Sequence, residues 1–89
     1  MEKSEKPPSS FGKILVETRR SLGITQYQLA KLSGVNERYL NYLEHGVKEP
    51  RLSMIIKLAR AMGIPAGTMV DAVDREELLA EASSQNKHV

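Results

Sequence analysis

A short stretch of the chain, residues 36 to 45, is rich in side chains that can form specific hydrogen bonds. If this stretch is a helix with Leu40 and Leu43 pointing into the protein, the side chains on its outward face are Asn36, Glu37, Arg38, Asn41 and Tyr42, with His45 at its end. Arginine suits the paired acceptors of guanine, asparagine suits adenine, and glutamate can accept a hydrogen bond from cytosine N4. A face exposed only to solvent would more often carry Lys and Glu. The first five outward residues therefore predict contacts to the bases of duplex DNA.

The sequence offers no support for catalysis. It contains no Cys, which excludes a thiolate metal site and a Cys nucleophile. The two histidines, His45 and His88, lack ligand spacing to a carboxylate pair, and neither a Gly-rich phosphate loop nor a base for a Ser nucleophile is present. An acidic run could be imagined as a metal site, but a solvated helix face is the favoured interpretation of Asp71, Asp74, Glu76, Glu77 and Glu81. We therefore expect a protein that is not an enzyme and that holds no metal or cofactor.

Length and composition limit the fold to one small core. With 89 residues, the chain is shorter than the common single-domain size of about 100 to 150 residues. Hydrophobic residues make up 40% of it, but there is a single Phe and no Trp, so the core must be aliphatic. No apolar stretch is long enough for a transmembrane helix, and the N-terminus has no signal-peptide pattern. We expect a soluble, cytoplasmic protein.

The net charge of +2 conceals an uneven distribution of charge along the chain. Residues 11–62 contain nine Lys or Arg and four Glu, whereas residues 63–89 contain two Lys or Arg and five Asp or Glu. A basic body with an acidic tail is consistent with a polyanionic partner for the body. An ordinary solvated surface explains the same charges equally well, so charge alone does not decide between them.

The N-terminal part of the chain predicts a flexible arm followed by a helix. Residues 1–10 are charged and Pro-rich, with almost no apolar side chain to repay the entropy of ordering them. The helix can start at Ser9 or Ser10, and Gly23 ends it. Its apolar stripe has the spacing of one helical face and consists of Phe11, Ile14, Leu15, Thr18 and Leu22.

Two short helices with matching start signals follow. Thr25 and Gln28 fit a capping box, and Asn36 is an equally good cap for the next helix, which runs to about His45. Between the two, Gly34 suits the left-handed conformation that a sharp turn needs. No segment shows the alternation that a strand requires. The predicted fold class is therefore all-α, a compact bundle of about five short helices with a helix-turn-helix.

The C-terminal third predicts shorter elements. A fourth helix is expected over residues 52–62, and Pro65 opens a weak fifth turn. Asp74 with Glu77 fits another capping box, so a short sixth helix is possible before residues 83–89 fray. The expected organisation is a flexible arm over residues 1–10, a DNA-binding domain over 11–73, and a short acidic helix with a frayed tail over 74–89.

Several short motifs, taken in order, make this sequence resemble the XRE family, the phage-repressor-like (Cro-type) helix-turn-helix proteins that bind DNA. They span about Phe11 to Val73 and comprise Arg19-Arg20, Gly23 to Gln26, Leu29-Ala30, Ser33-Gly34-Val35, Glu44-His45-Gly46, Pro50 and Leu58 to Ile64. The resemblance implies that the helix after Asn36 is a recognition helix that enters the major groove of DNA. It also implies that Gln26 contacts the DNA backbone, and that Arg19 and Glu44 form a structural pair between the first and third helices.

A second group of polar residues surrounds the recognition helix and fits contacts to phosphate. The group consists of Thr25, Gln26, His45, Lys48 and Arg51. Gln26 gains from its place at a helix N-terminus, where free N–H groups and the helix dipole favour an anion. Two alternatives stay open: Thr25 could serve only as a cap, and Lys48 and Arg51 could be solvated surface charges.

These features together predict a sequence-specific transcriptional regulator, in the first instance a repressor, that binds double-stranded DNA. One such module offers little contact area, so a homodimer on a palindromic operator is expected. Its candidate interface is the segment of residues 64–82, whose apolar side chains exceed what so short a tail can bury alone. The alternative is a protein-interaction adaptor on the same fold, antitoxin-like or coactivator-like, that would use the acidic segment after Val73 as its main interface.

Overall fold

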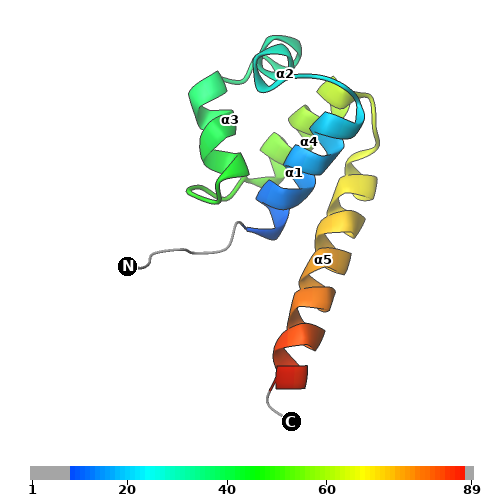
Figure 1. Ribbon diagram of the computed structural model, residues 1–89. Coiled ribbons are helices and arrows are strands. Elements are labelled where there is room, and N and C mark those ends of the chain that lie inside the picture. Colours follow the sequence, from blue (N-terminus) through cyan, green and yellow to red (C-terminus); the bar gives the residue numbers. More distant parts are fainter. Residues whose placement is uncertain (1–8, 88–89) are drawn as a thin grey trace.

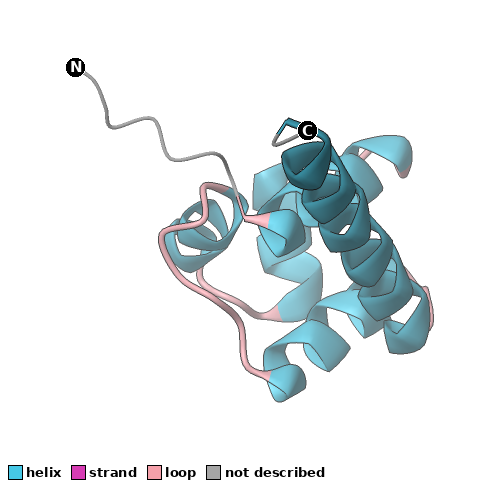
Figure 2. Cartoon of the chain, turned by 90° about the horizontal axis from the view of Figure 1, so that it is seen from below, coloured by secondary structure: helices cyan, strands magenta, loops and turns pink. Residues whose placement is uncertain are grey.

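Five helices joined by short loops form the part of the chain that the structure, a computed structural model, describes: residues 9–87. They are α1 (Ser10–Ser21), α2 (Gln26–Ser33), α3 (Glu37–Glu44), α4 (Leu52–Met62) and α5 (Ala66–Lys87) (Figure 1). Only helices and loops occur in this part of the chain (Figure 2), which confirms the all-α prediction. Residues 1–8 of the predicted arm (residues 1–10) and residues 88–89 lie outside the described residues, whereas Ser9 caps α1 and Ser10 begins it.

The first three helices start at the predicted capping residues. Ser9 Oγ accepts a hydrogen bond from the Gly12 N–H at 2.9 Å. Thr25 Oγ1 accepts from the Gln28 N–H at 3.0 Å and Gln28 Oε1 accepts from the Thr25 N–H at 2.8 Å, so the capping box is complete. Gly34 ends α2 with a φ of 74°, in the left-handed region that favours glycine. Local sequence signals therefore account for the helix-turn-helix.

The prediction of a break in the helix at Asp74 is wrong, because α5 runs without interruption from Ala66 to Lys87. Pro65 directly precedes this helix, where its fixed φ and missing N–H do no harm. Asp74 therefore lies inside a helix that tertiary packing already holds: Met69 is buried, and Val73, one turn after Met69, packs against the core. Residues 83–87, expected to fray, continue the same helix.

The core is aliphatic, as the composition predicts. Its fully buried large side chains are Leu15, Leu29, Leu40, Leu43, Leu58 and Met69. α1 packs against α3 and α5, whereas α2 packs against α3 and α4, and α4 also contacts α5. Lys13 Nζ on α1 lies 2.7 Å from Glu76 Oε2 on α5. The hydrogen bond to Glu76 and the negative charge of that carboxylate raise the pKa of the Lys13 ammonium.

None of the helices in the described part of the chain combines the length and the apolar composition that crossing a membrane requires. The described residues also bring no three His, Cys, Asp or Glu side chains together in a group that could hold a metal ion.

Gly12 allows α1 to approach the C-terminal end of α3 closely. A Cβ atom at this position would lie 2.7 Å from the carbonyl oxygens of both Leu43 and Glu44. These are backbone atoms, so they cannot move aside as the end of a flexible side chain could. The contact sets the distance between α1 and α3, and α3 carries the predicted base contacts.

We expect Gly12→Ala to lower the free energy of unfolding by about 1–3 kcal/mol, the usual cost of overpacking a core. The matched control is Gly67→Ala in α5, where an added Cβ meets nothing within 4 Å. The control should be neutral or stabilise the fold by about 0.5–1 kcal/mol, because Ala favours a helix more than Gly does. Urea unfolding followed by circular dichroism measures both. Equal responses of the two variants would contradict the close approach of α1 to α3.

Candidate nucleic-acid interface

α3 presents the predicted base contacts on one outward face. Leu40 and Leu43 are fully buried, while the side chains exposed on the same helix and its cap are Asn36, Glu37, Arg38 and Asn41. Asn36 has less freedom than the sequence indicates, because its Oδ1 accepts hydrogen bonds from the N–H groups of Arg38 at 2.8 Å and Tyr39 at 3.3 Å. Its side-chain amide nitrogen is the atom that is left to donate to a base.

Tyr42, the fifth predicted base contact, is half-buried at the end of α3. Its carbonyl oxygen accepts from the N–H groups of Val47 at 2.8 Å and Lys48 at 3.4 Å. Lys48 Nζ lies 5.9 Å from the centroid of the Tyr42 ring, within reach of a cation–π interaction. The structure therefore brings a predicted base contact and a predicted phosphate contact together, and it attaches the loop after α3 to the recognition helix.

A buried ion pair holds α3 against α1. Arg19 Nε donates to Glu44 Oε2 at 2.7 Å and Arg19 Nη2 donates to Glu44 Oε1 at 3.1 Å, which is the pairing that the resemblance implies. Both residues are 8% exposed. Arg19 Nη1 also donates to the carbonyl oxygen of Ile24 at 3.0 Å, in the loop before α2. The two charges are thus paired in a bidentate geometry that makes charge-assisted hydrogen bonds strong.

Gln26 belongs to the same network, which the sequence does not reveal. Its Nε2 donates to Glu44 Oε1 at 3.0 Å, and its side chain is half-buried at the first residue of α2. One carboxylate therefore fixes both the end of α3 and the start of α2. This arrangement holds the Gln26 side chain in place beside the N–H groups at the start of α2, before any contact with an anion.

The remaining predicted phosphate contacts are all exposed. Thr25 caps α2 through Oγ1, which is the role that the sequence left open for it as an alternative to a phosphate contact. A hydroxyl group that accepts one hydrogen bond can still donate another. His45 Nδ1 lies 2.9 Å from the Asn41 carbonyl oxygen at the end of α3. Arg51 precedes α4 and makes no side-chain capping hydrogen bond there. Its guanidinium is thus not used to cap that helix.

The ring of Tyr27, the second residue of α2, is 57% exposed. Lys31, four residues later on α2, places its Nζ 5.4 Å from the ring centroid. Tyr27 and Lys31 line a shallow groove together with Asn36 and Glu37 at the start of α3. The signal that could have found them is spacing, since each lies two residues from the buried Leu29 and so points away from the core. Tyr39 on α3, in contrast, packs partly against the core.

A helix-turn-helix whose second helix turns hydrogen-bonding side chains outward defines a class of DNA-binding module. Residues 15–68 match the family described as Helix-turn-helix, and the chain belongs to this family. The match is of the XRE type, which confirms the resemblance seen in the sequence.

Known relatives place the chain among regulators. It is 32% identical over 63 residues to y4dJ, an HTH-type transcriptional regulator of Sinorhizobium fredii, and the match covers 71% of this chain and 82% of that relative. Among solved structures, it is similar to the restriction-modification controller protein C.AhdI from Aeromonas hydrophila, with 37% sequence identity and a TM-score of 0.65. The match covers 67% of this chain and 91% of C.AhdI. It is also similar to the clp gene regulator ClgR from C. glutamicum, with 27% sequence identity and a TM-score of 0.71, and this match covers 78% of this chain and 92% of ClgR. DNA-binding transcription regulation is the function class that these findings support for this chain.

Proposed function

We propose that this protein is a sequence-specific repressor that reads duplex DNA with α3 in the major groove. The observation that carries the proposal is the division of α3 into two faces. Leu40 and Leu43 are buried, Glu44 is fixed by Arg19, and hydrogen-bonding side chains point outward. Arg38 and Asn41 are the central readers, because their side chains match guanine and adenine edges. Asn36, Glu37 and Tyr42 complete the base-reading set.

Around α3, a set of polar residues contacts the phosphates on either side of the groove. Gln26 and Thr25 stand at the start of α2, where free N–H groups favour an anion. His45, Lys48 and Arg51 lie at the end of α3, in the following loop and before α4. These contacts set the position of α3 on the duplex, and the base contacts supply the specificity.

The protein acts as a homodimer through residues 64–82. Exposed apolar side chains in this segment support the dimer: Leu78 is 58% exposed and Leu79 is 62% exposed. Met69 and Val73, which the sequence also suggests for the interface, pack on the chain's own core, so the interface consists of the outer side chains of α5. A two-fold dimer requires an operator with matching two-fold symmetry.

Selection of bound sites from a random pool of duplex DNA tests this function. We expect enrichment of a sequence with two inverted half-sites, because two copies of α3 related by a two-fold axis read the same bases in opposite directions. The half-sites should be separated by about one helical turn, 10–10.5 base pairs, or a multiple of it. A pool that stays random after repeated selection, with a protein partner bound instead, would favour the adaptor over the regulator.

A further inference from the structure

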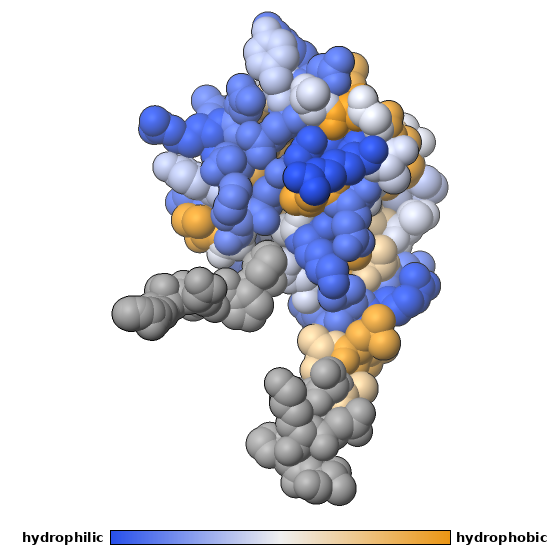
Figure 3. Space-filling model, viewed as in Figure 1, coloured by the Kyte–Doolittle hydropathy of each residue, from blue (hydrophilic) through white to orange (hydrophobic). Residues whose placement is uncertain are grey.

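The second half of α5 extends beyond the other helices (Figure 1). Met69 and Val73 on α5 point toward the core, so helical spacing places a different set of side chains on the opposite side. We call this set the acidic face of α5, and it consists of Asp71, Asp74, Leu78 and Glu81, all of them exposed. Arg75 also lies on this face, between Asp71 and Leu78, and the face is net negative because its three carboxylates outnumber this one cation. Figure 3 shows hydrophobic surface on the extended part of α5, next to hydrophilic surface.

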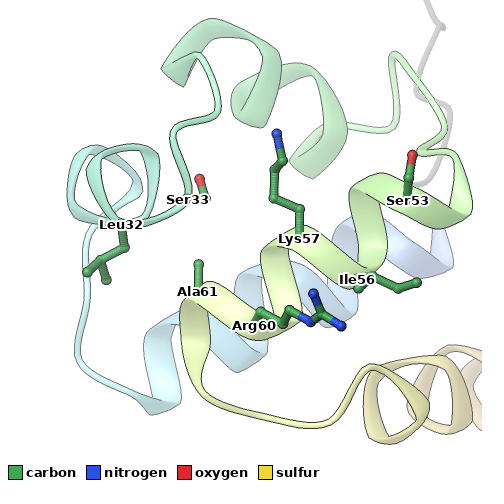
Figure 4. Close-up of a pocket in the computed structure, with 7 residues that line it drawn as sticks. All are labelled: Leu32, Ser33, Ser53, Ile56, Lys57, Arg60 and Ala61. Atoms are coloured by element: carbon green, nitrogen blue, oxygen red, sulfur yellow. The ribbon is translucent and has the colours of Figure 1, made fainter.

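A groove between α2 and α4 has the opposite character. This open, shallow groove has a volume of about 490 Å³, and we call it the basic groove. Its lining residues are Leu32 and Ser33 from α2 with Ser53, Ile56, Lys57, Arg60 and Ala61 from α4 (Figure 4). Leu32 is 61% exposed. Lys57 and Arg60 are exposed as well, and neither forms an ion pair with any other side chain that the structure describes.

The two surfaces are complementary, yet they cannot meet within one molecule. Each combines an exposed leucine with charges of a single dominant sign, negative on α5 and positive in the groove. The acidic face points away from the chain's own core, while the groove lies between α2 and α4 of that core. The acidic face of α5 can therefore enter a basic groove only in another molecule, and a second copy of this chain presents that face on an extended helix.

We propose that in the dimer the acidic face of α5 of each copy lies in the basic groove of the other. Leu78 of one copy packs against Leu32 and Ile56 of the other, and the carboxylates beside it face Lys57 and Arg60. The proposal rests on the proposed homodimer and adds to it a surface outside residues 64–82. Two identical contacts related by a two-fold axis close the assembly at two copies.

Charge reversal on each side tests the contact without DNA. The groove variant Lys57→Glu/Arg60→Glu and the helix variant Asp74→Lys/Glu81→Lys each place like charges together in both contacts of a homodimer. We expect each variant alone to bind itself about a hundredfold more weakly than the wild type in sedimentation equilibrium, because like charges facing each other cost several kcal/mol. An equimolar mixture should form a heterodimer of near wild-type affinity, since both of its contacts then join opposite charges. Recovery in the mixture also shows that both variants are folded.

Three outcomes would overturn this contact. The first is a groove variant that dimerises as tightly as the wild type while Leu78→Asp/Leu79→Asp is monomeric: the dimer then stands and forms through α5 alone. The second is a mixture that remains monomeric while both variants keep their helical circular dichroism. The third is a wild type that is monomeric at all concentrations, which removes the proposed dimer as well. DNA reading by α3 is measured separately on selected duplex, so it can succeed or fail independently of all three.

Discussion

Replacing Glu44 with alanine is expected to lower the free energy of unfolding by about 3–5 kcal/mol, the cost of breaking a buried ion pair from one side. Arg19 would keep its charge at a site where it is 8% exposed, with only the Ile24 carbonyl oxygen left as a partner. Gln26 would lose its acceptor in the same step. Domains of this size have a total stability of about 5–15 kcal/mol, so a large part of the fold's stability depends on this carboxylate. Urea unfolding followed by circular dichroism measures the loss.

Two controls separate burial from charge in the Glu44→Ala experiment. Glu76→Ala removes another interhelical pair, with Lys13, whose side chain is 48% exposed, and it should change stability little because exposed pairs contribute little. The double variant Arg19→Met/Glu44→Leu removes both buried charges and should recover much of the loss, since apolar side chains of similar volume can replace a buried pair. If Glu44→Ala and Glu76→Ala were equally stable, the pair of Arg19 and Glu44 would not be what holds α3 to α1.

Arg38→Ala and Asn41→Ala should each weaken binding to the selected operator by about 1–3 kcal/mol, with little effect on random duplex. Each substitution removes a side chain that matches a particular base edge, and neither residue is part of the core. The two positions are one helical turn apart, so their combined effect need not be additive. Titration of labelled operator and of random duplex at one salt concentration measures the ratio of the two affinities.

Phosphate contacts should respond in a different way. Lys48→Ala is expected to weaken binding to operator and random duplex alike, and to lower the salt slope by about one unit, because about 0.9 counterions are released per neutralised phosphate. Gln26→Ala should also weaken both, but the residue is neutral and the slope should stay nearly unchanged. If Arg38→Ala and Asn41→Ala lowered both affinities to the same extent as Lys48→Ala does, α3 would not be reading bases.

The sequence by itself determines the helix-turn-helix, because its signals act within a turn or two of the chain. Thr25 with Gln28, and Asn36 with the N–H groups after it, satisfy helix ends through neighbours two or three residues away. Leucine spacing decides which face of α3 is buried, and so leaves Arg38 and Asn41 outside. The partnership of Arg19 with Glu44 was available only through the family resemblance, since 25 residues separate the two along the chain.

Only the tertiary structure decided the features that join distant segments. Gly12 looks like any glycine in a helix until the carbonyl oxygens of α3 lie beside it. The Asp74–Glu77 pattern is as good a helix start as that of Thr25, but the packing of α5 on α1 and α4 continues the helix through it, because burying apolar side chains outweighs one capping hydrogen bond. The hydrogen bond from Gln26 to Glu44 and the groove between α2 and α4 likewise depend on how neighbouring helices pack. The spacing of residues along one helix carries no information about the distance between two helices.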